Sequence, residues 1–375
     1  MRIAVVHSHY RSDLPSGEGE VVAQQVEALK RAGHEVATIF RYSDVELNKP
    51  VYKFRSAWRV VTGHGHNPGA ELERFRPQVV HVHNLFPNFG DAWARHSPAP
   101  VVATLHNFRP LCAAGTLTLH GQPCTACPDG NWPSAVVHSC YHGSRAASLP
   151  LAIRNRRGAE RDRLLEHAAK VVVLSERARR TYATYGIADE RLHVIPNFTP
   201  AVAAPPADES GPWLFAGRLV PEKGVAQLLA AWPYEQPLKM VGEGPLRHDL
   251  AARYPQVAFT GHLSHEEVME LIPAARGLLI PSRWAEGLPQ VYLEALAAGV
   301  PAIASEGSSA ADHVSAHGTG VVVPREFNSD DLRVATAAVL TERGELARRC
   351  RDVHASQFSV AQWLKSIEGL YRSVL

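Results

Sequence analysis

Short apolar runs alternate with helix-length segments along most of this 375-residue chain, and this alternation limits the folds available to it. Met1–Ser8 is such a run. A polar loop follows it, then a segment with apolar residues at helical spacing up to Gly33, then a second apolar run at His34–Phe40. Short apolar runs separated by helices are typical of parallel sheets, whose strands are buried on both faces. The sequence therefore predicts an α/β chain of the doubly wound type.

A break near the middle of the chain separates two such series. Residues 199–211 are rich in Pro, Ala and small polar residues without a helical or strand period, as expected of a linker. Since a domain typically has about 100–200 residues, the length of the chain predicts two domains. We place them at residues 1–198 and 212–355. An amphipathic helix follows at residues 356–375.

The charge balance argues against nucleic acid as a partner. The chain has 39 Lys and Arg against 37 Asp and Glu, a net charge of +2, whereas nucleic-acid-binding domains are typically strongly basic. Five arginines do cluster between Arg154 and Arg163. They form either a solvated helix face or a contact with an anionic membrane surface or a phosphate-bearing acceptor.

The start of the chain and its hydropathy predict a cytoplasmic protein. The sequence opens directly on an apolar strand, without the charged and apolar regions of a signal peptide. No apolar run reaches the roughly 18 residues of a membrane span. Peripheral membrane contact through Arg154–Arg163 remains compatible with this prediction.

The segment AEGLPQVYLEALAAGVP, from Ala285 to Pro301, follows an apolar run, so it starts at the carboxyl end of a predicted strand. Pro289 suits the first turn of a helix, and Gly299 suits its C-cap. Glu286 then lies in the loop before the helix and Glu294 on the helix. The free N–H groups of such a helix start suit a diphosphate. Two surface carboxylates on an amphipathic helix would give the same pattern.

A second motif is FAGRLVPEKG, from Phe215 to Gly224. A predicted strand ends at Gly217, and the loop that follows contains Arg218 and Lys223. Two cations at the end of a strand and near the start of a helix can clamp phosphate groups. The alternative is an ordinary solvated turn.

The two motifs together resemble those of glycosyltransferase family 4, whose members have the GT-B fold. In that family a G-R-x(4)-K-G loop and an E-x(7)-E pair bind the nucleotide sugar. The resemblance implies two Rossmann-like domains with an interdomain cleft, a donor site in the second domain, an acceptor site in the first, and a last helix that packs back on the first. It extends along the chain through GHEV at 33–36, VVHVHN at 79–84, VIPNF at 194–198, VGEGP at 241–245 and FTGHL at 259–263.

The resemblance also assigns roles to individual residues. It implies that Arg218 and Lys223 hold the donor diphosphate and stabilise the leaving phosphate. It places Glu286 against the transferred sugar and Glu294 on the ribose hydroxyls, and it places His106 in the lining of the transfer site. The first loop, GEGE, departs from the adjacent glycines usual in the family. Further donor contacts are implied at Gly17, Gly19, Asn197, Gly217, Gly261, Gly287 and Leu288.

The family further implies transfer of a hexose-type sugar with retention of anomeric configuration and with no cofactor required for catalysis. Arg218, Lys223 and the helix after Glu286 would supply the electrophilic clamp. The expected acceptor is a glycan, a glycolipid or a small natural product. Two other classes stay open: a nucleotide-sugar epimerase on the same fold, which would convert donor without acceptor, and a non-catalytic module that binds sugar nucleotides.

Four of the five cysteines fall in a loop-like, Cys-rich insert at about residues 108–143. Two of them form a C-x-x-C pair. Four thiolates in a cytosolic protein indicate a structural Zn²⁺ site. Reduced structural cysteines or a redox pair remain as alternatives. The four residues are Cys112, Cys124, Cys127 and Cys140.

Overall fold

The computed structural model describes residues 1–10, 12, 17–47, 51–202, 211–283 and 287–375. These residues divide into two compact units. Unit 1 comprises Met1–Leu117, Cys124–Pro196 and Leu364–Leu375, and unit 2 comprises Thr118–Pro123 and Asn197–Trp363. Each unit has one six-stranded parallel sheet, as predicted for an α/β chain of the doubly wound type.

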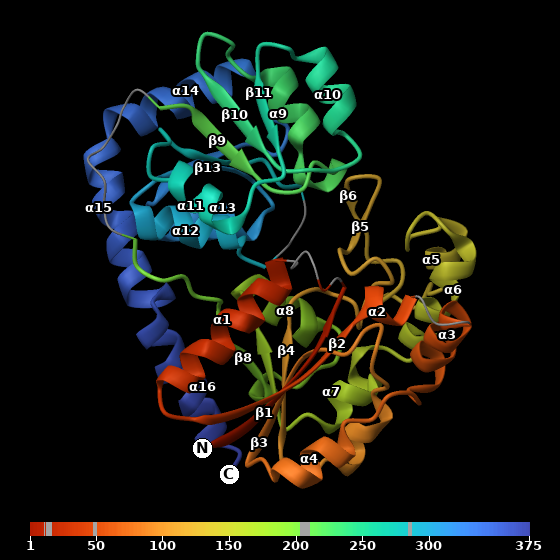
Figure 1. The fold of residues 1–375 in the computed structure, drawn as a ribbon. Helices are drawn as coiled ribbons and strands as arrows, with labels where there is room; N and C mark the ends of the chain where they lie inside the picture. Colours follow the sequence, from red (N-terminus) through yellow and green to blue (C-terminus); the bar gives the residue numbers. More distant parts are fainter. Residues whose placement is uncertain (11, 13–16, 48–50, 203–210, 284–286) are drawn as a thin grey trace. The chain divides into compact units, whose positions relative to one another are not determined.

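The sheet of unit 1 has the strand order β2-β1-β3-β4-β7-β8, and every neighbouring pair is parallel (Figure 1). The order changes direction between β1 and β3. At such a switch point the connections leave in opposite directions and leave room for a ligand at the carboxyl ends. The strands are β1 (Arg2–His9), β2 (Glu35–Tyr42), β3 (Val79–Asn84), β4 (Val101–Leu105), β7 (Lys170–Val173) and β8 (Leu192–Val194).

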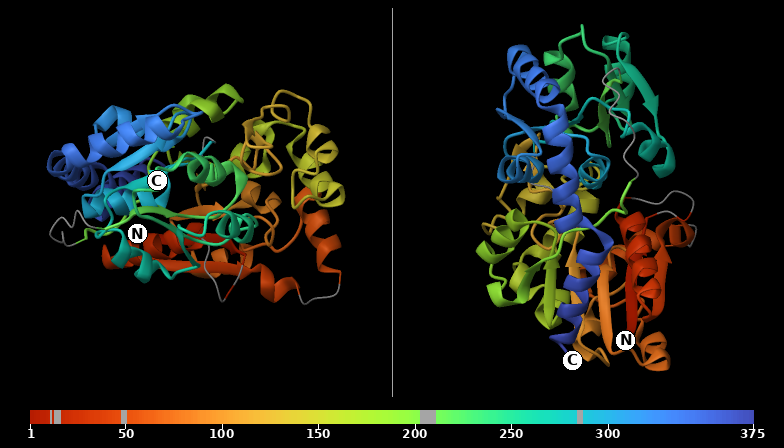
Figure 2. Two further views of the ribbon diagram at one scale, coloured as in Figure 1. Left: turned by 90° about the horizontal axis from the view of Figure 1, so that it is seen from above. Right: turned by 90° about the vertical axis from the view of Figure 1, so that its left-hand side faces the viewer.

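Helices flank this sheet (Figure 2). The end of the last helix belongs to the same unit: Tyr371 Oη lies 2.6 Å from His81 Nδ1 on β3, and Glu368 lies 2.9 Å from His34 Nε2. The helices of unit 1 are α1 (Gly17–Arg31), α2 (Ser43–Leu47), α3 (Tyr52–Thr62), α4 (Gly69–Phe75), α5 (Ser134–Val137), α6 (Arg145–Asn155), α7 (Arg163–His167), α8 (Glu176–Thr184) and the end of α16 (Val360–Arg372).

The first helix begins earlier than its apolar period suggests. Gly17 and Gly19 lie in the first turn of α1, not in a loop before it. Glu20 in the same turn favours this earlier start, because a carboxylate near a helix N-terminus interacts favourably with the positive end of the helix dipole.

The sheet of unit 2 has the strand order β11-β10-β9-β12-β13-β14, again with every pair parallel. In chain order this is 3-2-1-4-5-6, the dinucleotide-binding type of doubly wound sheet, with its switch point between β9 and β12. The strands are β9 (Trp213–Ala216), β10 (Leu238–Val241), β11 (Ala258–Gly261), β12 (Leu278–Ile280), β13 (Ala302–Ser305) and β14 (Gly320–Val323).

Both faces of this second sheet are buried, which explains its uninterrupted apolar runs. Trp213 and Phe215 of β9 point into one core, whereas Leu214 points into the other. The helices of unit 2 are α9 (Val225–Ala231), α10 (Arg247–Arg253), α11 (His265–Leu271), α12 (Gln290–Ala298), α13 (Ser309–His317), α14 (Ser329–Thr341), α15 (Arg343–Val353) and the start of α16. None of the helices in the described part of the chain has both the length and the hydropathy to span a bilayer.

Candidate functional site

In unit 2, the loops that leave β9 and β12 contact each other at the switch point. The Arg283 N–H donates to the Glu222 carbonyl at 2.9 Å. Gly224 has φ of 67°, and a Cβ built on it would overlap the Pro281 carbonyl oxygen. Only glycine combines this backbone conformation with so close an approach. The loop that contains Arg218 and Lys223 is thereby held against residues 281–283.

The loop after β10 contacts the loop after β9 as well. The Leu219 N–H donates to the Glu243 carbonyl at 2.8 Å, and a Cβ on Gly242 would overlap the Gly217 carbonyl oxygen. The Gly242 N–H donates in turn to the Gly261 carbonyl at 2.8 Å. The VGEGP motif therefore packs the loops together. Gly217 and Gly261, for which the family resemblance implies donor contacts, both lie against Gly242.

The charged groups of unit 2 occupy different environments. Arg218 is exposed at the carboxyl end of β9, and Lys223 is half-buried. Glu294 on α12 is 3% exposed, and its Oε1 lies 3.5 Å from Nδ1 of His265 at the start of α11. A carboxylate buried to this extent requires polar partners. His265 was not predicted from the sequence, because nothing in its neighbourhood marks it as a partner of Glu294.

The start of α12 is tied to the beginning of unit 2. Gln290 Nε2 donates to the Phe198 carbonyl at 2.9 Å. The residue before Phe198, the buried Asn197, therefore lies near the start of α12. Gly287 and Leu288 lie half-buried just before the helix. Glu286, predicted to face the sugar, lies outside the described residues.

In unit 1, histidines of β1, of β3 and just after β4 lie together near the other switch point. His83 Nδ1 lies 3.0 Å from His106 Nε2, and His81 Nε2 lies 2.7 Å from Thr104 Oγ1. Burial lowers the pKa of His7 to about 2, that of His81 to about 3 and that of His106 to about 4. These rings are therefore neutral at pH 7, and His106 can donate or accept a hydrogen bond but carries no charge.

Glu18 is a residue of this region that motif matching missed. Burial raises the pKa of its carboxyl to about 7, although the nearby Asn84 amide and Arg109 guanidinium act in the opposite direction. Glu18 Oε1 lies 4.0 Å from His7 Nδ1, and neither atom has a hydrogen-bond partner among the described residues. A buried carboxyl with a raised pKa beside unpaired polar atoms is typical of a binding region.

Replacing Glu18 with glutamine is expected to change stability in a pH-dependent way. Because the folded-state pKa is raised, ionisation of Glu18 destabilises the fold as pH rises from about 4.5 to above 7. Glu18→Gln should match the wild type near pH 4 and exceed it near pH 8 by about 3 kcal/mol. Urea unfolding at both pH values tests this. If the two proteins differed in free energy of unfolding by the same amount at both pH values, the raised pKa of Glu18 would be wrong.

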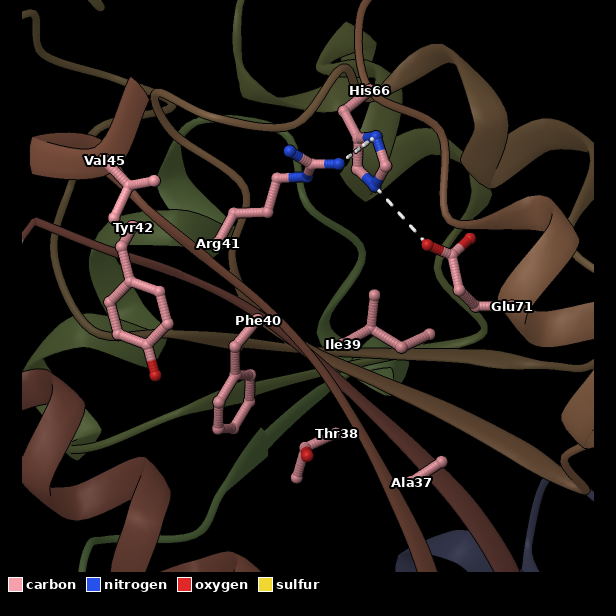
Figure 3. Close-up of a pocket in the computed structure, with 9 residues that line it drawn as sticks. All are labelled: Ala37, Thr38, Ile39, Phe40, Arg41, Tyr42, Val45, His66 and Glu71. Atoms are coloured by element: carbon pink, nitrogen blue, oxygen red, sulfur yellow. Dashed lines mark hydrogen bonds and ion pairs between the residues drawn. The ribbon is translucent and has the colours of Figure 1, made fainter. Parts of the chain in front are cut away.

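A cavity of about 400 Å³ lies along the edge strand β2 (Figure 3). Arg41 Nη2 donates to His66 Nδ1 at 2.8 Å, which leaves the His66 proton on Nε2, 3.7 Å from Glu71. These polar groups therefore bind one another within the lining of the cavity. None of the residues predicted from the sequence lines it.

The four clustered cysteines are free thiols. Burial, and secondarily the thiols of Cys112, Cys140 and Cys124, raises the pKa of Cys127 to about 11. No group of three or more His, Cys, Asp or Glu side chains in the described parts of the chain is arranged to hold a metal ion. The geometry therefore does not support the predicted zinc centre, since an ion would have to draw the thiolates together as it binds. Metal analysis of protein purified without chelator tests it: about one zinc per chain would establish the centre, and metal-free protein would remove it.

The arginine cluster does not form a single surface. Arg154 pairs with Asp162 at 2.6 Å and with Asp91 at 3.5 Å, and Arg163 pairs with Asp91 at 3.5 Å. The guanidinium groups of Arg154 and Arg163 thus form ion pairs within unit 1. A contact with an anionic surface through the whole of Arg154–Arg163 would have to break these pairs.

The sequence profile of the family described as "Glycosyltransferase Family 4" matches residues 15–201, and that of "Glycosyl transferases group 1" matches residues 205–354. A glycogen synthase of Mycobacterium tuberculosis is 27% identical, with 97% of this chain and 92% of that protein covered. The structure of sucrose-phosphate synthase from Thermosynechococcus elongatus has a TM-score of 0.68 at 20% identity, covering 99% and 98%. That of Anabaena HepE in complex with UDP-glucose has a TM-score of 0.67 at 16% identity, covering 100% of both chains.

Two six-stranded parallel sheets with flanking helices, and structural neighbours that match over the whole chain, define the GT-B fold. The two matching sequence profiles define the class of protein, a glycosyltransferase. The chain belongs to glycosyltransferase family 4.

Proposed function

We propose that this enzyme transfers a hexose from a nucleoside-diphosphate sugar to a glycan, glycolipid or small-molecule acceptor, with retention of anomeric configuration. The observation that carries the proposal is the pair of loops at the β9/β12 switch point. They hold Arg218 and Lys223 at the carboxyl edge of the sheet, beside the segment that leads into α12. Cations and free helix N–H groups together favour a diphosphate.

In the proposed reaction, the bond between the sugar C1 and the diphosphate oxygen breaks, and the acceptor oxygen bonds to C1 on the same face. The acceptor proton passes to the leaving diphosphate, so charge is balanced. Arg218 and Lys223 stabilise the negative charge that grows on this leaving group. We assign Glu286 to the transferred sugar and the neutral His106 to the acceptor, as the family resemblance implies.

Glu294 is proposed to hold the ribose of the donor. Its burial beside His265 fixes the carboxylate on a rigid helix, and a carboxylate is a good acceptor for two neighbouring hydroxyls. The complex of Anabaena HepE with UDP-glucose makes uridine nucleotides the first donors to test.

A thermal-shift screen with UDP-, GDP-, ADP- and TDP-sugars tests this donor site. One nucleotide class should stabilise the protein, by about 2.7 kcal/mol at a hundred times its Kd. Glu294→Gln should lose most of this stabilisation, whereas the exposed Glu270→Ala on α11 should keep it.

Two outcomes would overturn the proposal. Stabilisation that Glu294→Gln leaves intact would place the nucleotide elsewhere. Conversion of the donor into an epimeric nucleotide sugar without any acceptor would identify an epimerase in place of a transferase.

A further inference from the structure

Helix α3 exposes large apolar side chains while its other side is anchored in unit 1. Phe54 is 78% exposed and Trp58 is 66% exposed, one helical turn apart, and Val51 is 58% exposed just before the helix. Such side chains normally pack inside a fold. We call these three residues the α3 apolar face.

The anchoring of α3 shows that this exposure is not the result of a loosely attached helix. Tyr52 Oη donates to Asn88 Oδ1 at 3.1 Å, and Arg59 Nη1 donates to the Pro87 carbonyl at 2.6 Å. Val60 is buried in a small core with Leu151 of α6. The unit thus holds the helix on one side and presents the apolar face on the other.

The two stretches of chain that form this face and the helices packed beside it are basic. Helices α3 and α6 pack together, as do α5 and α6 (Figure 1). They come from two stretches, residues 47–70 and 130–159, that contain eight Lys and Arg and no Asp or Glu, in a chain whose net charge is only +2. Arg59 and Arg154 of these stretches bind groups inside unit 1. The exposed cations are Lys53, Arg55, Arg145, Arg156 and Arg157.

This combination fits a particular partner. Cations alone would suit any acidic macromolecule, and an apolar patch alone would suit many proteins. Aromatic side chains on a helix flanked by cations and free of carboxylates are typical of a surface that lies on an anionic bilayer. The aromatic rings enter the headgroup region, and the cations meet the lipid phosphates. Leu149 on α6 and Val137 on α5 extend the exposed apolar surface.

We propose that unit 1 docks on anionic lipid bilayers through the α3 apolar face and the neighbouring cations. These cations are Lys53 and Arg55 of α3, Arg145 of α6, and Arg156 and Arg157 just after α6. This inference does not depend on the donor proposed above. It shares Arg156 and Arg157 with the Arg154–Arg163 cluster but centres the membrane contact on α3.

Flotation of the full-length chain with lipid vesicles tests the inference. The protein should float with vesicles that contain phosphatidylglycerol, much less with pure phosphatidylcholine, and less at high salt. Lys53→Gln with Arg55→Gln should weaken the partition coefficient by about 25-fold, since each cation contributes about fivefold. Phe54→Ser with Trp58→Ser should weaken it by at least about tenfold.

The matched control is Val334→Ser, which removes a 71%-exposed apolar side chain from α14 of unit 2. It should bind vesicles as the wild type does. Circular dichroism melting of every variant verifies folding. Equal binding to neutral and anionic vesicles would overturn the proposal. Charge-dependent binding that survives Phe54→Ser with Trp58→Ser would also overturn it, because the α3 apolar face would then take no part in binding.

Discussion

Arg218→Ala is expected to lower kcat by about a hundred- to a thousand-fold, the usual effect of removing a preorganised group that stabilises charge in a transition state. Lys223→Ala should lower kcat to a similar extent. The donor diphosphate is charged before the reaction, but its leaving-group oxygen gains charge only as the bond to C1 breaks. The loss should therefore be larger in kcat than in KM.

Steady-state kinetics of transfer measures both parameters. Arg333→Ala serves as the control, because Arg333 is an exposed cation of unit 2 that pairs with Glu235 on the surface. It should leave kcat unchanged. If Arg218→Ala raised only KM, the cation would act in substrate binding alone, and its proposed part in stabilising the leaving group would be wrong.

Gly224→Ala should almost abolish activity while the chain still folds. Alanine at φ of 67° costs about 1 kcal/mol. Its Cβ would also overlap the Pro281 carbonyl oxygen, so the loops after β9 and β12 must separate. A displacement of about 1 Å at a catalytic group can cost about a hundredfold in rate, and we expect at least that loss.

Gly33→Ala is the matched control for the backbone strain. Gly33 has a similar φ of 83°, but a Cβ there meets no atom within 4 Å. The two variants should lose a similar amount of stability to strain, and only Gly224→Ala should also lose activity. Equal activity in the two variants would show that contact between these loops does not position the clamp.

The fold is predictable from the sequence because a parallel sheet that is buried on both faces requires continuous apolar runs in its strands. Strands such as β9 and β12 are apolar at successive residues, and this pattern is readable without a structure. The motif around Arg218 and Lys223 is also recognisable in the sequence, because its loop needs glycines at fixed positions to pack against the neighbouring loops.

The residues that sequence analysis missed depend on contacts between distant segments. Glu18 looks like any acid near a helix start, and only the fold places it beside His7 and raises its pKa. Arg154 looks like a surface cation until Asp91 and Asp162 are seen to pair with it. The exposure of Trp58 is equally invisible, because aromatic residues at helical spacing normally indicate a core.

Hydrogen exchange of the full-length chain, with and without the nucleotide sugar that binds it, tests the donor site most directly. We predict that the donor slows exchange most in the peptides that cover residues 217–224 and 287–298, which contain the cationic loop, the start of α12 and Glu294. Protection confined to other segments, with these two unchanged, would contradict the assignment of the donor site to the β9/β12 switch point.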